Sequence, residues 1–144
     1  MLKELFVFSF VLAEMCISSA GYAESISEEY ILQERCGKRA EEVFIRDHGS
    51  CSMSNTCTNN SWAIYSNHYN KKLKKCFILT SSHSDKSPKK SIVTKTLEDV
   101  NERKDYGVFL SDVGEHKPFS CTVGDIECNS VSSWEKLIAP YMEE

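Results

Sequence analysis

The sequence predicts an α+β domain: an N-terminal helix, a four-stranded antiparallel sheet made of two hairpins, and a C-terminal helix, held together by disulfide bonds. Three observations support this fold class. Apolar residues recur at helical intervals near both ends of the chain, strand-like segments lie between them, and six cysteines follow residue 23. A run of strands flanked by helices favours an α+β fold over an alternating α/β fold.

The first 23 residues have the features of a cleavable secretory signal. Lys3 gives a positively charged start, and residues 5–13 are apolar except for one serine. Small residues then stand at the two positions of the segment 21–23 that signal peptidase reads. An apolar core of this length is too short to span a bilayer. We therefore expect cleavage before Glu24, leaving residues 24–144 as one mature domain that is periplasmic or secreted and has no membrane span.

Cleavage also removes Cys16 and leaves an even set of cysteines. A lipid-anchored Cys16 is disfavoured because Glu14 and Met15, rather than small residues, precede it. In an oxidising compartment six cysteines are most simply three disulfides, although many connectivities are possible. The spacing favours two local links and one long link between the first helix and the sheet: Cys51–Cys57, Cys121–Cys128 and Cys36–Cys76.

The spacing of apolar residues predicts a first helix over residues 27–47. Ser25 and Glu28 have the spacing of a capping box at its start, and Gly49 is a natural stop at its end. Residues 50–60, rich in Ser, Asn and Thr, are expected to form a loop. Three apolar side chains share the face of the helix that we expect to be buried: Cys36, Ala40 and Phe44.

Two segments rich in aromatic and β-compatible residues, 62–69 and 76–80, predict the first hairpin, with Asn70-Lys71-Lys72 as its turn. In the second strand, apolar side chains occupy both alternating positions, so we expect this strand to lie inside the sheet and to be covered on both faces. One face would carry Cys76 and Ile78, and the other Phe77 and Leu79.

The second half of the chain predicts another hairpin and a helix. Residues 81–91, rich in serine and lysine, are expected to be a mobile connection that supplies no core. Residues 92–100 and 106–113 then form the second hairpin, and residues 114–129 a loop. A final helix begins after a serine cap, and Pro140 should loosen or kink its last turn. Its apolar face would carry Val131, Trp134, Leu137, Ile138 and Tyr141.

No motif in the sequence predicts catalytic, metal-binding or cofactor-binding residues. The cysteines lack the short spacing of zinc ligands and of redox-active pairs, and the four histidines are scattered. The serine of Gly49-Ser50-Cys51 lacks the strained turn of a hydrolase nucleophile. Adjacent carboxylates, Glu28-Glu29 and Glu41-Glu42, diverge on a helix and are expected to be solvated. The sequence therefore implies no cofactor.

A basic stretch begins at the turn of the first hairpin and lies close to aromatic residues. Binding to an anionic surface is conceivable for such a stretch. The chain is nevertheless acidic overall, with a formal net charge of −4, and lysines around a hairpin commonly protect a sheet edge. We therefore expect no nucleic acid as partner. The stretch comprises Lys71, Lys72, Lys74, Lys75, Lys86, Lys89, Lys90 and Lys95.

Three segments resemble small exported bacterial proteins to which no activity is assigned. The segments are Cys36-Gly37-Lys38-Arg39-Ala40, the hairpin sequence NHYNKKLKKCF at residues 67–77, and Trp134-Glu135-Lys136-Leu137. The resemblance extends over much of the mature chain. It implies a bacterial periplasmic or secreted setting, and it carries over no functional residue.

Two functions follow as hypotheses, and the sequence favours the first without excluding an enzyme. The first is a non-enzymatic exported domain that binds another protein or an envelope component, as inhibitors, adhesins and envelope factors do. The second is an envelope hydrolase or small-ligand-binding protein whose site forms only in three dimensions. Its weak candidates are Asp47, His48, His68 and Asp112.

Overall fold

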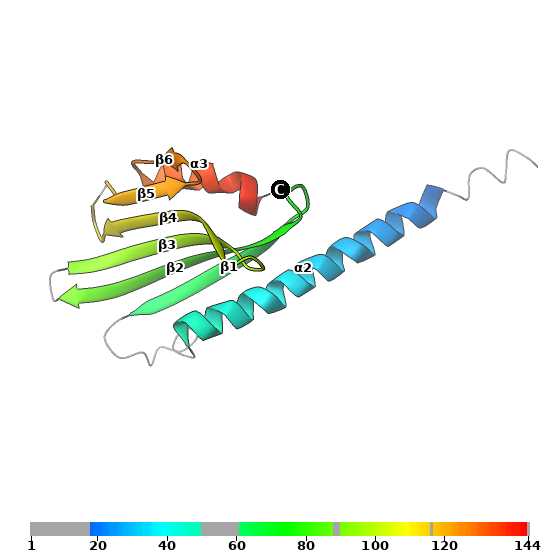
Figure 1. Ribbon diagram of the computed structural model, residues 1–144, viewed down its shortest axis with the longest axis horizontal. Coiled ribbons are helices and arrows are strands. Elements are labelled where there is room, and N and C mark those ends of the chain that lie inside the picture. The colour runs from blue at the N-terminus through cyan, green and yellow to red at the C-terminus, as the bar shows by residue number, and fades with distance from the viewer. Residues whose placement is uncertain (1–17, 50–60, 88–89, 116, 144) are drawn as a thin grey trace, which may run out of the picture. The chain divides into compact units, whose positions relative to one another are not determined.

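The computed structural model describes residues 18–49, 61–87, 90–115 and 117–143 (Figure 1). The chain divides into two compact units, Met1–Leu32 and Gln33–Glu144. In the first unit the described residues are helical and form the N-terminal half of helix α2 (Ser18–His48). The apolar core of the predicted signal peptide lies outside the described residues, so cleavage and export remain predictions. No helix among the described residues is long and apolar enough to cross a membrane.

The helix α2 begins earlier than the sequence predicts, at Ser18 instead of residue 27. The capping box at Ser25 does not start the helix, because the small residues before it continue the helical turn. The predicted end is confirmed, since α2 stops at His48 and Gly49 follows with a φ of +68°. A left-handed conformation of this kind is favourable for glycine and satisfies a free carbonyl group, here that of Ile45.

The second unit is built on one antiparallel sheet, whose strands lie side by side in chain order (Figure 1). An antiparallel sheet combined with two helices confirms the α+β class. The sheet has six strands, not the predicted four. They are β1 (Trp62–Asn70), β2 (Lys75–Ser87), β3 (Lys90–Asp99), β4 (Lys104–Asp112), β5 (Ser120–Val123) and β6 (Ile126–Glu127), and helix α3 (Val131–Met142) follows them.

The two additional strands lie in the segment that was predicted to be a loop. β5 has four residues and β6 has two, which is too short for an alternating apolar pattern to be recognised. The positions of both strands are instead set by pairing, of β5 with β4 and of β6 with β5. Phe109 in β4 lies opposite Cys121 in β5, and the disulfide to Cys128 encloses the β5–β6 turn.

Residues 81–91 are not the mobile connection that the sequence predicts. β2 and β3 extend through most of this segment as a paired ribbon, with Ser81 opposite Lys95 and Asp85 opposite Ser91. A register shift follows between Asp85 and Ser87. The ribbon can form without a hydrophobic core beneath it, because the backbone groups of its two strands pair with one another. Its Ser and Thr side chains are also compatible with a pleated surface.

A first core joins α2 to one face of the sheet. The aromatic ring of Phe44 lies 4.4 Å from that of Tyr65, measured between centroids. The disulfide Cys36–Cys76 connects helix and strand within this core, with a Cα–Cα distance of 5.4 Å. The buried members are Cys36, Ala40, Val43, Phe44, Ala63, Cys76, Ile78 and Val100.

A second core joins α3 to the opposite face of the sheet. Trp134 is fully buried there, and the absence of a side chain at Gly107 gives its ring room, since a Cβ would lie 3.0 Å from it. Phe77 belongs to this core whereas Ile78 belongs to the first, so the prediction that β2 is covered on both faces is confirmed. The buried members are Phe77, Leu97, Phe109, Cys121, Val123, Trp134 and Ile138.

The described residues form two disulfide bonds, Cys36–Cys76 and Cys121–Cys128. The third expected link, Cys51–Cys57, lies outside the described residues. α3 begins with a capping box in which Ser130 and Ser133 exchange side-chain and backbone hydrogen bonds, and it continues past Pro140 to Met142.

Candidate functional site

The sheet face that packs against α3 extends beyond the second core. At one end of that face Trp62 lies opposite His83, and Asp85 lies opposite Ser91. None of these residues belongs to the described core beneath α3. Trp62 is 46% exposed, and Ile64, two positions along the same edge strand, is 60% exposed. We call these five residues the Trp62 platform.

Aromatic stacking and polar contacts order the platform. The rings of Trp62 and His83 are stacked, with centroids 5.7 Å apart and an interplanar angle of 15°. His83 Nε2 lies 3.5 Å from Asp85 Oδ1. The Ser91 hydroxyl donates a hydrogen bond to the same carboxylate oxygen at 2.5 Å. Asp85 therefore joins β2 to β3 beside a half-exposed indole ring.

The order of these contacts differs from that of a serine hydrolase. In a Ser-His-Asp triad the histidine stands between serine and carboxylate, so that the imidazole accepts the serine proton. In the platform the carboxylate of Asp85 stands between Ser91 and His83, and the Ser91 proton already points to Asp85. Ser91 therefore faces a carboxylate in place of the imidazole base of such a triad. The platform presents an aromatic face beside a hydrogen-bond acceptor.

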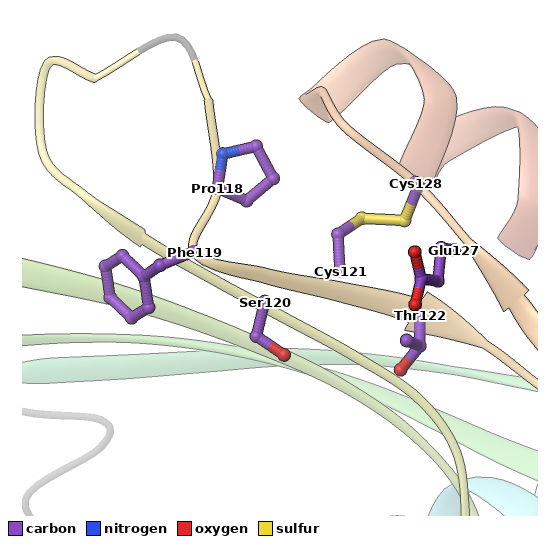
Figure 2. Close-up of a pocket in the computed structure, with 7 residues that line it drawn as sticks. All are labelled: Pro118, Phe119, Ser120, Cys121, Thr122, Glu127 and Cys128. Atoms are coloured by element: carbon purple, nitrogen blue, oxygen red, sulfur yellow. A yellow bond between two sulfur atoms is a disulfide. The ribbon is translucent and has the colours of Figure 1, made fainter.

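A small hollow of about 260 Å³ lies at the far edge of the sheet, around β5 and β6. Figure 2 shows the Cys121–Cys128 disulfide and Glu127 on one side of it and Phe119 on the other. Both of its cysteines are disulfide-bonded, so Glu127 is the one titratable side chain among the residues that line it. The lining therefore lacks the pair of groups that acid/base chemistry needs. It is lined by Pro118, Phe119, Ser120, Cys121, Thr122, Glu127 and Cys128.

Two of the weak candidates, Asp47 and His48, have contacts at the end of α2. Arg103 Nη2 donates a hydrogen bond to Asp47 Oδ2 at 2.8 Å, and Arg46 contacts the other oxygen. Burial alone would raise the pKa of Asp47, but the two arginine hydrogen bonds outweigh it and lower the pKa below its usual value. The His48 ring packs on Phe44 with centroids 5.0 Å apart.

The other two candidates, His68 and Asp112, lie on opposite faces of the sheet. His68 is opposite Phe77 and so shares the α3 face, whereas Asp112 is opposite Ile92 on the other face. The structure therefore does not bring the four candidates together. Within the described ranges, no group of three or more His, Cys, Asp or Glu side chains is placed to hold a metal ion.

Two lysines of the basic stretch, Lys75 and Lys95, contact other side chains. Lys75 Nζ lies 2.6 Å from Asp99 Oδ2 and 2.7 Å from Glu102 Oε1. These hydrogen bonds raise the pKa of Lys75 above its usual value. Lys95 instead lies over the Phe109 ring, 5.8 Å from its centroid. The charge of Lys75 is thus compensated locally.

Three residues of the platform, His83, Asp85 and Ser91, lie in the segment predicted to be mobile, so the sequence does not indicate that they join Trp62. A period-two signal was present there, since His83 and Asp85 alternate with serines. Serine, lysine and proline in the same segment made a loop the simpler interpretation. That Ser91 of β3 lies opposite Asp85 of β2 follows only from the register of the two strands.

Fold and site together define a class: a disulfide-containing α+β domain whose antiparallel sheet carries an aromatic and polar platform at an open edge. No protein-family model, no curated protein and no solved structure matches the chain.

Proposed function

We propose that this chain is an exported, non-enzymatic domain that binds a protein partner through the Trp62 platform. The observation that carries the proposal is the exposure of Trp62 and Ile64, 46% and 60%, on an edge strand. Exposed apolar side chains that lie together, beside polar groups, are typical of protein interaction sites. Tryptophan is also among the residues that contribute most to binding energy.

The chemistry of the platform indicates what the partner presents. Trp62 and Ile64 would be covered by an apolar side chain of the partner. Asp85, whose side chain is 30% exposed, would accept a hydrogen bond from a hydroxyl group or a cation beside that apolar group. A partner segment that combines an apolar anchor with an adjacent donor fits these neighbours.

Export is supported by the cysteines and by the N-terminal segment. Disulfides persist in oxidising compartments, and the two bonds of the described structure are consistent with such a setting. The apolar run at residues 5–13, followed by small residues before Glu24, supports secretion as the route.

The test compares the mature chain with two double variants in pull-downs from a cell-envelope extract. Trp62→Ala/Ile64→Ala truncates the platform. Phe119→Ala/Ile126→Ala is the matched control, because both residues are 57% exposed and lie near the opposite edge of the sheet. The urea midpoint of each variant checks that the fold is intact.

We expect one stoichiometric protein with the wild type and with the control. With the platform variant, the affinity for that purified protein should fall by about 30-fold, which corresponds to the loss of one hot-spot residue. Equal affinity for the two variants would overturn the proposal, and so would the failure of the wild type to recover any partner.

A further inference from the structure

We propose that the disulfide Cys121–Cys128 is a thiol-exchange site, at which a small thiol that also carries a positively charged amine forms a mixed disulfide with Cys128. The site lies at the β5–β6 edge of the sheet, whereas Trp62 lies in β1 at the other edge. The inference therefore goes beyond the proposed function, and neither depends on the other.

The two described disulfides differ in how accessible they are to solvent. Cys36 and Cys76 are 3% and 2% exposed and belong to the first core. Cys121 is 6% exposed, whereas Cys128 is only partly buried and packs at the border of the second core. Exposed disulfides are the ones that exchange with thiols, and the rate depends on access to the attacked sulfur. An incoming thiol therefore reaches Cys128 more readily than any other cysteine of these two bonds.

The hollow beside β5 and β6 gives a thiol its way to this disulfide. Both cysteines line the hollow, and Figure 2 shows the S–S bond on its wall. Pockets for drug-sized ligands usually measure about 300–1,000 Å³, so a hollow of about 260 Å³ suits a smaller molecule. The size of the hollow therefore favours a thiol of low molecular weight.

Glu127 gives the hollow a preference for a positively charged thiol. Its side chain lies on the same side of the hollow as the disulfide (Figure 2), and the other lining residues are uncharged. A carboxylate attracts an ammonium group and repels a second carboxylate. Because Glu127 is exposed, the preference is that of a surface ion pair, about two- to fivefold in rate. A small aminothiol fits both the size and the charge of the hollow.

The exchange step replaces one sulfur–sulfur bond by another and consumes no oxidant. The aminothiolate sulfur bonds to Cys128 Sγ while the bond between Cys128 Sγ and Cys121 Sγ breaks. The electron pair of the broken bond stays on Cys121 Sγ, which takes up a proton from solvent. The products are a mixed disulfide at Cys128 and a thiol at Cys121. A second aminothiolate that attacks the sulfur of the first releases their disulfide and leaves Cys128 as a thiol.

The other contacts of the β5–β6 turn indicate that the domain stays folded after the exchange. β5 pairs with β4 along its whole length, and this pairing does not require the S–S bond. The Cys128 N–H also donates to the Cys121 carbonyl at 2.9 Å. The exchange is a modification of this chain and not a catalytic cycle, so it does not need the Cys-x-x-Cys spacing of a redox enzyme.

The test exposes the oxidised, folded chain to cysteamine, with acid quenching, alkylation of free thiols and peptide mapping. Cys128 should carry the cysteamine adduct and Cys121 the alkyl group. Both should appear at least about tenfold faster than any label on Cys36 or Cys76. In urea both disulfides should react, which shows that the reagent can modify either. Adducts that form first on Cys121, or equal rates for the two disulfides in the folded chain, would overturn the proposal.

Glu127→Gln tests the preference for a positive charge, and Glu41→Gln, an exposed carboxylate of α2 that does not line the hollow, is the matched control. The readout is the initial rate with cysteamine divided by the rate with thioglycolate, an anionic thiol. Because both thiols meet the same fold, a general loss of stability leaves this ratio unchanged. The ratio should fall about two- to fivefold in Glu127→Gln and stay at the wild-type value in Glu41→Gln. An unchanged ratio in Glu127→Gln, or the same fall in both variants, would contradict an aminothiol as the reactant.

Discussion

The side-chain amide of Asn70 donates a hydrogen bond to the carbonyl oxygen of Pro140 at 2.9 Å and so joins the end of β1 to the last turn of α3. The Asn70 side chain is fully buried, and its carbonyl oxygen accepts the N–H of Leu73 at 2.9 Å. Carbonyl groups at a helix C-terminus have no partner within the helix. Asn70 supplies one from a different part of the chain.

Replacing Asn70 should therefore weaken the attachment of α3. In Asn70→Ala the carbonyl of Pro140 and the N–H of Leu73 both lose the hydrogen bond to this side chain, which should cost about 1–3 kcal/mol of unfolding free energy. Equilibrium urea unfolding followed by Trp fluorescence measures this loss. Asn67→Ala is a suitable control, because within the described residues the one hydrogen bond of its side chain is a long contact of 3.8 Å with Cys36 Sγ. Equal losses in the two variants would contradict the role of Asn70.

The two described disulfides should differ in how much they stabilise the domain. Cys36–Cys76 closes 40 residues and Cys121–Cys128 closes 7, so removing the unfolded-chain constraint should cost about 4 and about 2 kcal/mol. Double variants, Cys36→Ala/Cys76→Ala and Cys121→Ala/Cys128→Ala, avoid free thiols. Thermal and urea unfolding of both rank the losses. A smaller loss for the long link would show that its loop closure is not what stabilises the fold.

Asp99 should matter more for stability than Glu102, although both carboxylates contact Lys75. Asp99 is 1% exposed, and its Oδ1 also accepts the N–H of Asn101 at 2.9 Å. Asp99→Asn removes the charge from this buried position and should cost about 2 kcal/mol. Glu102 is 58% exposed, so Glu102→Gln should cost less than about 1 kcal/mol. Urea midpoints of the two variants, measured side by side, decide the order.

The same lysine sets an expectation for alkaline pH. The pKa of Lys75 is raised in the folded state, so its contribution to stability is complete below the usual value of 10.5 and is lost only as the pH rises through the folded value. Between pH 6 and pH 9, the difference in urea midpoint between wild type and Asp99→Asn should therefore stay constant. A difference that shrinks within this range would contradict the assignment.

Two glycine substitutions should change stability in opposite directions. A Cβ at Gly107 would lie 3.0 Å from the Trp134 ring and 3.1 Å from the Thr122 carbonyl, so Gly107→Ala should cost about 1–3 kcal/mol. Gly37 lies within α2, where a Cβ would make an ordinary contact of 3.7 Å with Asn67. Gly37→Ala should therefore stabilise the domain by about 0.5–1 kcal/mol. Thermal unfolding of the pair would contradict this if both shifted in the same direction.

The sequence was most informative where the physical signal is local. The alternation from Cys76 to Leu79 predicts a strand covered on both faces, and the two cores confirm it. The positions of the two hairpins and of the C-terminal helix were also predicted, because apolar periodicity and turn residues act over a few neighbouring positions. By contrast, β5 and β6 are too short to carry such a signal, and pairing with β4 decides them.

The α+β class, the order of the first four strands between the two helices and the two-sided burial of β2 were thus determined by the sequence alone. The tertiary structure decided what the sheet presents to other molecules. The stacking of Trp62 on His83, the contact of Ser91 with Asp85 and the hydrogen bond from the Tyr69 N–H to Gln33 each join residues on two different elements. For the two contacts within the sheet the physical reason is register, because strand pairing brings these side chains together and a shift by one residue would place each on the opposite face. The Tyr69 contact depends instead on the packing of α2, which carries Gln33, against β1.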